Sequence, residues 1–283
     1  MERPNTIVLI HGLFMTALSW EKWVERYADR GYQVIAKSWP GMDDIAALRQ
    51  DPSGVADLGI AEIVDYYDSL IRQLDEAPII IGHSFGGAFT EILLDRGLGA
   101  AGVAIDAAAV RGILKLPLSQ LKAGFPILKS PANFHKAVEL SPEQFHYAFT
   151  NTLSEADSNA AYARYAVPGP GRVLFQGALA NLNPHSPATV DFRKDRAPLL
   201  LIAGGADHLV PAVIDKSAAD HYAKSGAVTE YKLFPGRSHW TIAEPGWEEV
   251  ADYALDWATT HARTTKAPAA ESITATTSSN AGA

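Results

Sequence analysis

Short apolar runs alternate along the chain with longer segments whose apolar residues recur at helical spacing. Most of the runs are continuously apolar, which is typical of parallel strands buried on both faces. They lie at about Thr6–Ile10, Tyr32–Ala36, Pro78–Ile81, Ala101–Ile105, Leu199–Ala203 and Val228–Phe234. Helical patterns occupy the intervals, at about Ser19–Arg30, within about Val55–Leu74, and at about Phe85–Arg96, Ala212–Ala223 and Trp247–Thr259. This alternation predicts an α/β protein with a parallel sheet and right-handed crossovers.

The alternation of apolar runs and helical patterns stops between Asp106 and Pro198. The intervening segment is interrupted by prolines, and Ser141 and Gln144 have the spacing of a capping box at the start of a helix. We therefore expect residues 1–110 and 198–261 to form the core and residues 111–197 to form a mostly helical cap. The cap is expected over the carboxyl ends of the strands. Residues 262–283 lack apolar content and are expected to be a disordered tail.

The segment Gly82–Gly86 reads Gly-His-Ser-Phe-Gly and joins an apolar run to a helical pattern. A serine between two glycines at a strand-to-helix junction is the pattern of a nucleophile elbow. The turn is so tight that the flanking positions tolerate almost no side chain. It would place the Ser84 hydroxyl at a helix N-terminus, where backbone N–H groups can stabilise an oxyanion. The alternative is a glycine-rich turn that carries an inert serine.

A second turn, His11–Phe14, follows the first apolar run and can supply another backbone donor. We expect the oxyanion hole to consist of the N–H groups of Leu13 and Phe85, with Phe14 as the alternative to Leu13. For His11 we favour a structural role, as a partly buried imidazole bonded to loop backbone.

Asp207 and His239 each follow a later apolar run, so both are expected at the same edge of the sheet as Ser84. The order Ser84, Asp207, His239 is that of serine, acid and histidine in one class of hydrolytic triads. His239 would serve as general base, and Asp207 would hold the imidazole in the required tautomer. Asp106 ends another run and is the alternative acid.

Taken together, these motifs resemble those of the α/β-hydrolase superfamily over roughly residues 5 to 260. The resemblance implies a three-layer fold and a serine hydrolase of the carboxylesterase-like branch. Only five residues precede the first apolar run, so the N-terminal antiparallel hairpin of the family has no room. We therefore expect about six parallel strands. Hydrolysis through an acyl-enzyme requires no metal and no organic cofactor.

Aromatic and apolar side chains flank the catalytic elements and recur in the expected cap. The candidates for substrate contact are Phe14, Met15, Phe145, Phe149 and Trp240. No cluster of arginine or lysine marks a phosphate site, so the expected substrate is a small to medium apolar or aromatic carboxylic ester. Two alternatives use the same fold: a cofactor-free dioxygenase or C–C bond hydrolase, and a non-catalytic receptor for a small ligand.

Composition narrows the possible partners and location. The chain has 283 residues and a formal net charge of −8, which disfavours nucleic acid and anionic membranes as partners. It has no cysteine, which excludes disulfides and thiolate metal sites. No signal-peptide pattern and no apolar run of transmembrane length is present, so we expect a cytoplasmic enzyme. We expect a monomer or a homodimer.

Overall fold

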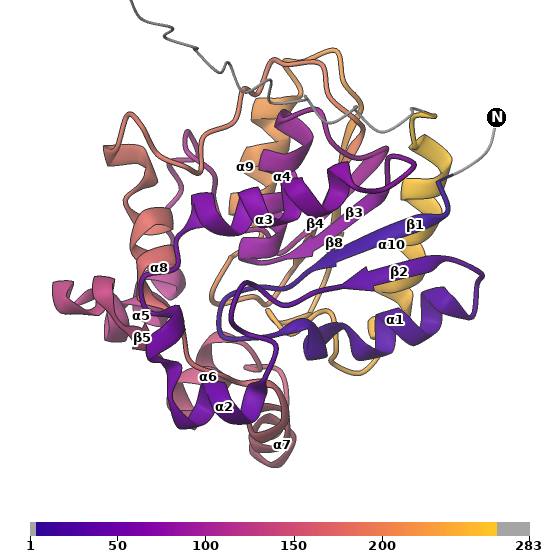
Figure 1. Ribbon diagram of the computed structural model, residues 1–283. Helices are drawn as coiled ribbons and strands as arrows, with labels where there is room; N and C mark the ends of the chain where they lie inside the picture. The colour runs from indigo at the N-terminus through magenta and orange to yellow at the C-terminus, as the bar shows by residue number, and fades with distance from the viewer. Residues whose placement is uncertain (1–3, 265–283) are drawn as a thin grey trace, which may run out of the picture.

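The computed structural model describes residues 4–264 and contains a six-stranded parallel sheet with helices on both faces (Figure 1). The strand order is β2-β1-β3-β4-β7-β8, and every neighbouring pair is parallel. The strands are β1 (Thr6–Ile10), β2 (Gln33–Ala36), β3 (Ile79–His83), β4 (Ala101–Ile105), β7 (Leu199–Gly204) and β8 (Thr229–Phe234). All six lie where the apolar runs predict them, so the expected sheet is confirmed.

Alternate residues of the central strands belong to two separate cores, because successive side chains of a strand point to opposite faces. In β1, Val8 and Ile10 join the larger core, whereas Ile7 and Leu9 join the smaller one. Figure 1 shows α3, α4 and α9 on one side of the sheet and α1 and α10 on the other. Their bounds are α1 (Glu21–Ala28), α3 (Ile60–Arg72), α4 (Phe85–Asp95), α9 (Val213–Tyr222) and α10 (Trp247–His261).

The segment between β4 and β7 is largely helical and includes a two-stranded antiparallel ladder. Its elements are α5 (Leu118–Leu128), η3 (Pro131–His135), β5 (Ala137–Val138), α6 (Pro142–Ala148), α7 (Glu155–Tyr165), β6 (Gly169–Pro170), α8 (Gly171–Ala178) and η4 (Ala180–Leu182). The capping box at the start of α6 is formed as predicted, with Ser141 accepting from Gln144 N–H and the Gln144 side chain accepting from Ser141 N–H. Backbone hydrogen bonds from Val167 N–H to the Phe14 carbonyl and from Trp240 N–H to the Phe149 carbonyl join this segment to the loops after β1 and β8.

Three short elements between β1 and α3 were not predicted from the apolar pattern. They are η1 (Ala17–Trp20), α2 (Ile45–Gln50) and η2 (Pro52–Val55). The helix expected within about residues 55–74 runs over Ile60–Arg72, and the tighter turn of η2 precedes it. Of the tail expected at 262–283, residues 265–283 lie outside the described residues. No helix within 4–264 combines the length and apolar character needed to cross a membrane.

The order of the strands reverses between β1 and β3. The chain passes from β1 outward to β2 and then crosses to β3 on the other side of β1. In open α/β sheets, ligands bind in the crevice at such a switch point, beyond the carboxyl ends of the strands. The loop His11–Phe14 and the turn at Ser84 follow these two neighbouring strands and therefore meet at this crevice.

Candidate active site

Ser84 occupies a strained turn between β3 and α4. Its backbone has φ 57° and ψ −122°, a conformation that non-glycine residues rarely adopt. The glycine at position 86 is required for close packing, because a Cβ atom there would lie 2.1 Å from the carbonyl oxygen of Ile10. The predicted nucleophile-elbow geometry is therefore formed, with the serine at the N-cap of α4.

Residues with strained backbone are concentrated at the carboxyl ends of three neighbouring strands. Within the described residues, three non-glycine residues have positive φ: Phe14 at 68°, Ser84 at 57° and Asp106 at 45°. They follow β1, β3 and β4, which are adjacent in the sheet. Strained backbone costs free energy and is retained mostly at functional sites, so this clustering marks the edge as the candidate site.

The loop after β1 lies directly against the serine. A Cβ atom added at Gly12 would be 2.7 Å from Ser84 Cβ and 3.3 Å from Ser84 Oγ. The backbone N–H groups of Leu13, Phe14 and Phe85 donate to no acceptor within residues 4–264. Phe85 is the first residue of α4, where an N–H group has no intrahelical partner. Free donors therefore lie on both loops beside the Ser84 hydroxyl.

His11 anchors this loop. Its Nε2 accepts a hydrogen bond from Trp39 N–H at 3.0 Å, so the proton is on Nδ1, which donates to the Gly12 carbonyl at 2.8 Å. The ring also stacks on Trp39, with centroids 4.8 Å apart. Burial lowers the pKa of His11 to about 4, and the bond to Gly12 opposes this shift. The expected bonding of His11 to loop backbone is confirmed, and the ring is fully buried, not partly buried as expected.

Asp207 and His239 form a buried pair, although 32 positions separate them in the sequence. His239 Nδ1 lies 2.6 Å from Asp207 Oδ2, and both side chains are fully buried. The other carboxylate oxygen accepts from the N–H groups of Leu209 at 2.7 Å and Val210 at 2.8 Å. The Nε2 atom of His239 has no partner among the residues that the structure describes. One ring nitrogen is therefore oriented by the acid, and the other is free to exchange a proton.

A buried glutamate that the sequence analysis did not identify holds the loop of His239. Ser238 donates to Glu244 through its hydroxyl at 2.8 Å and through its backbone N–H at 3.2 Å. Thr152, from the segment between β4 and β7, donates to the same carboxylate at 2.8 Å. Trp240 N–H donates to the Phe149 carbonyl at 2.9 Å. The loop that carries His239 is thus fixed on both sides.

His83, next to the serine, joins the loop of His239 to the nucleophile strand. Its Nε2 donates to the His239 carbonyl at 2.8 Å, and the two rings lie 4.7 Å apart between centroids. Burial lowers the pKa of His83 well below its usual value, with a further contribution from His239. A neutral His83 with its proton on Nε2 therefore positions the backbone of His239 next to the elbow.

Asp106, the alternative acid, binds backbone instead. Its Oδ1 accepts from Gly204 N–H at 2.6 Å, and its Oδ2 has no hydrogen-bond partner within residues 4–264. Burial raises the pKa of Asp106 well above its usual value, and the charges of Asp207 and Asp215 add to the shift. The Asp106 carboxyl therefore supports the turn after β7.

The side chains of His83, Asp106 and His239 together form a possible metal-binding group. One ligand atom from each of His83, Asp106 and His239 lies within 4.8 Å of the other two. Each residue already gives one polar atom to a protein partner: the His239 carbonyl, Gly204 N–H and Asp207, respectively. Hydrolysis by a serine and a histidine does not require a metal at this position.

This arrangement has relatives among known proteins. The sequence matches the Alpha/beta hydrolase family over residues 7–253. The chain belongs to this family. No curated protein matches the sequence.

Solved structures of similar fold include enzymes that act on esters. A monoacylglycerol lipase from Paleococcus ferrophilus is 20% identical, with 93% of this chain and 97% of that chain covered and a TM-score of 0.63. The methylesterase MES16 from Arabidopsis is 15% identical, with 90% and 99% covered and a TM-score of 0.63. An extracellular alpha/beta-hydrolase from a Paenibacillus species is 20% identical, with 92% and 100% covered and a TM-score of 0.64. At these identities the similarity establishes the fold.

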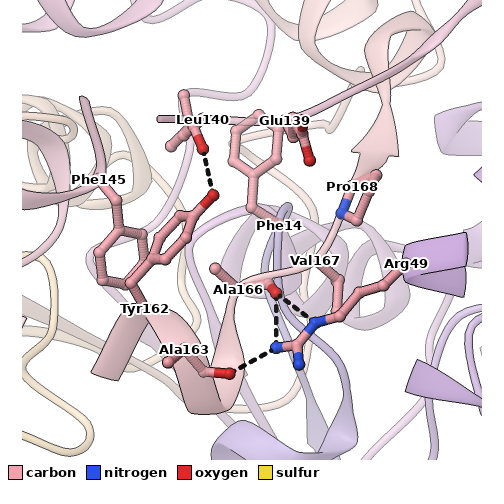
Figure 2. Close-up of a pocket in the computed structure, with 10 residues that line it drawn as sticks. All are labelled: Phe14, Arg49, Glu139, Leu140, Phe145, Tyr162, Ala163, Ala166, Val167 and Pro168. Carbon is pink, nitrogen blue, oxygen red and sulfur yellow. Dashed lines mark hydrogen bonds between the residues drawn. The ribbon is translucent and has the colours of Figure 1, made fainter. Parts of the chain in front are cut away.

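A cavity of about 330 Å³ lies between α2 and the segment that carries α6 and α7 (Figure 2). Its wall is apolar apart from a few groups, and Phe14, Phe145 and Tyr162 supply its aromatic rings. Arg49, from helix α2, which was not predicted, lines one side of the cavity. Its guanidinium donates to the carbonyls of Ala163 and Ala166, both at 2.9 Å. These acceptors are at the C-terminus of α7, where a cation is favourable.

The candidate substrate residues separate into two groups. Phe14 and Phe145 line the cavity. Phe149 and Trp240 lie behind that wall: Phe149 stacks on Phe145 with centroids 5.0 Å apart and meets the His239 ring edge-on at 4.9 Å, and Trp240 lies 6.3 Å from Phe145. Met15 is fully buried in the larger core and is not part of the cavity wall. A layer of aromatic rings therefore separates the cavity from His239.

Proposed function

We propose that this chain is a serine hydrolase that cleaves small to medium apolar or aromatic carboxylic esters through an acyl-enzyme. One observation carries the proposal: Asp207 holds Nδ1 of His239, while Nε2 has no partner among residues 4–264. His83, the residue before Ser84, donates to the His239 carbonyl and so holds this imidazole next to the elbow. Family membership and the esterases and lipase among the structural relatives support a hydrolase. The specific reaction rests on the chemistry of these side chains.

In the proposed reaction, His239 Nε2 removes the proton from the Ser84 hydroxyl as Oγ attacks the ester carbonyl. Asp207 stabilises the imidazolium that forms and keeps the proton of the neutral ring on Nδ1. The imidazolium then returns its proton to the leaving alcohol when the tetrahedral intermediate collapses. Water attacks the resulting acyl-enzyme by the same route in reverse, which releases the acid and restores the serine.

The negative oxygen of each tetrahedral intermediate would be bound by the free N–H groups of Phe85 and Leu13, with Phe14 as the alternative to Leu13. These donors belong to loops whose backbones are already fixed, so they need no rearrangement during the reaction. In a well-studied protease, one such donor contributes about 3 to 4 kcal/mol to transition-state stabilisation.

We further propose that residues 111–197 form a cap over a core of residues 1–110 and 198–261, and that the apolar cavity holds the acyl or alkoxy group. Ser84 is only 4% exposed and His239 is not exposed at all, so the site is closed. A substrate in the cavity must therefore displace the aromatic layer of Phe145 and Phe149 that separates it from His239. The wall is mostly apolar, with Arg49 and Glu139 as its charged residues, which supports an apolar or aromatic substrate group.

The test combines active-site labelling with a substrate series. Wild type, Ser84→Ala and the control Ser158→Ala, which removes another buried hydroxyl, are treated with a fluorophosphonate probe and with p-nitrophenyl esters of graded chain length. We expect wild type and Ser158→Ala to be labelled and to hydrolyse esters. Ser84→Ala is expected to remain folded, unlabelled and almost inactive.

Two results would replace the proposal with another function. Substantial turnover by Ser84→Ala, accompanied by oxygen consumption, would indicate a cofactor-free dioxygenase. Saturable binding of an apolar ligand, with neither labelling nor ester turnover by wild type, would indicate a receptor.

A further inference from the structure

Positive charge is concentrated in one part of this acidic chain. Between Asp106 and Glu139 the sequence has no acidic residue but contains five cationic ones: Arg111, Lys115, Lys122, Lys129 and Lys136. The four lysines are all exposed. The net charge of −8 therefore includes one segment of the opposite sign.

Large apolar side chains are exposed on the same segment. They are Leu114 (78% exposed), Leu116 (66%), Leu118 (84%), Leu121 (44%) and Phe125 (64%). Leu179 and Leu182 add to this group, because Asn181 between them bonds to Gly112 N–H and to the Ile113 carbonyl. Seven of the ten large hydrophobic residues exposed within residues 4–264 thus belong to two adjoining segments. A concentration of this kind marks an interaction site.

Helix α5 presents its large apolar residues outward. Leu118, Leu121 and Phe125 are spaced three and four positions apart, so they share one face of the helix. The opposite face, which packs into the protein, carries Ala123, Gly124 and Ile127. Burial in the fold would favour the reverse arrangement. In Figure 1, α5 lies at the periphery of the molecule, on the side away from α1 and α10.

We propose that this surface, residues 114–125 with the flanking Lys129, docks on an anionic lipid bilayer. Exposed leucine and phenylalanine can enter the interfacial region, while the lysines pair with anionic headgroups. A second copy of the chain is a poorer occupant, because a symmetric contact would bring the lysine-rich face against itself. The docking surface is distinct from the catalytic residues and does not depend on the proposed hydrolysis.

The experiment is co-sedimentation of the full chain with vesicles. One set is pure phosphatidylcholine, and the other contains about one third phosphatidylglycerol. We expect wild type to bind the anionic vesicles more tightly than the neutral ones, and less tightly as salt is raised. Lys115→Gln/Lys129→Gln should weaken binding by about fivefold per lysine. Lys122 is left unchanged because it lies over the ring of Tyr147.

A second pair tests the apolar contribution. Leu118→Ser/Phe125→Ser should weaken binding by at least about tenfold. The control Val213→Ser/Val228→Ser replaces side chains that are each 44% exposed elsewhere and should bind as wild type does. Circular dichroism shows whether the Leu118→Ser/Phe125→Ser variant folds. If it does not, vesicle binding by the Lys115→Gln/Lys129→Gln variant is the deciding test, with exposed Lys224→Gln as its control.

The proposal is overturned if wild type does not bind anionic vesicles, or if patch and control variants bind equally. It is also overturned if sedimentation shows a dimer that Leu118→Ser/Phe125→Ser converts to monomer. In that case the surface is an interface between copies of the chain.

Discussion

His239 Nδ1 lies 2.6 Å from Oδ2 of Asp207, and the second oxygen of that carboxylate is held by two backbone N–H groups. The carboxylate therefore cannot rotate without losing hydrogen bonds in a fully buried position. Because the orientation of the acid is fixed, the tautomer of His239 is fixed as well. Nε2 lacks the proton in the neutral ring, which is the form a general base requires.

Asp207→Asn tests this relationship. The amide preserves the shape of the side chain but can donate to Nδ1, which favours the tautomer with the proton on Nε2. We expect kcat for ester hydrolysis to fall by about 10⁴-fold with little change in KM. Steady-state kinetics on a p-nitrophenyl ester measures both values.

The matched control is Asp106→Asn. Burial raises the pKa of the Asp106 carboxyl, and an amide of the same shape can still accept from Gly204 N–H. We expect kcat to fall by less than about tenfold, because Asp106 does not contact the proton-transfer atoms. If kcat falls further in Asp106→Asn than in Asp207→Asn, Asp106 is the acid that supports His239.

Strain at the elbow gives a second prediction, on stability. Ser84 has φ 57°, which glycine adopts without strain and alanine does not. Ser84→Gly should therefore be more stable than Ser84→Ala by about 1 to 2 kcal/mol, while both lose ester turnover. Urea unfolding measures the difference. Equal stabilities would indicate that the turn is relaxed in solution.

The contact between Gly12 and Ser84 gives a third prediction. An alanine methyl at position 12 would approach Ser84 Cβ to 2.7 Å and must displace either the serine or the loop with its N–H donors. We expect Gly12→Ala to lower kcat/KM by at least about 100-fold, comparable to the loss of one oxyanion donor. Gly226→Ala is the control, because a methyl there meets nothing within 4 Å. An active Gly12→Ala would mean that this loop does not bear on the reaction.

The strands of this fold could be predicted from the sequence because each depends on its own apolar run. Helix α2 could not: its six residues are too few to show a helical period, and Arg49 gains its role by bonding to the end of α7, more than a hundred positions away. The same limit applies to the choice of acid. Asp106 and Asp207 both follow strands, and the structure distinguishes them by their contacts: Asp207 binds His239, whereas Asp106 binds Gly204 N–H.

Residues that act through others were also missed. His83 bonds to the carbonyl of a residue 156 positions away, and Glu244 holds Ser238 from within a turn. Neither contact has a local pattern that a reader of one sequence could recognise. The elbow could be predicted, because its glycines satisfy a steric need that is local to five residues.

The fourth prediction concerns acid stability and His11. Burial lowers its pKa from 6.5 to about 4, so the folded state prefers the neutral ring. The stability that this provides is fully present above pH 6.5 and is lost as the pH falls through 4. The difference corresponds to roughly 3 kcal/mol. We expect His11→Gln to be less stable than wild type at neutral pH, and the gap to close in acid by about that amount, as measured by urea unfolding across pH. His185→Gln, at an exposed site, should show no such trend.

Glu91 gives the fifth prediction, with the opposite sign. This buried residue accepts a hydrogen bond from Tyr222 at 2.8 Å. Burial raises its pKa from 4.5 to about 7, against the effects of Tyr222 and Arg196. Its contribution to stability is therefore fully present below pH 4.5 and is lost as the pH rises through 7.

Glu91→Gln stays neutral at every pH and can still accept from Tyr222. Relative to wild type, its free energy of unfolding should rise by roughly 3 kcal/mol between pH 4.5 and 8. The control is Glu155→Gln, at an exposed site. Its free energy of unfolding should differ from that of wild type by the same amount at every pH. A constant difference between Glu91→Gln and wild type across this range would mean that the carboxyl is ionised throughout. The charge of Arg196 would then outweigh desolvation at this position.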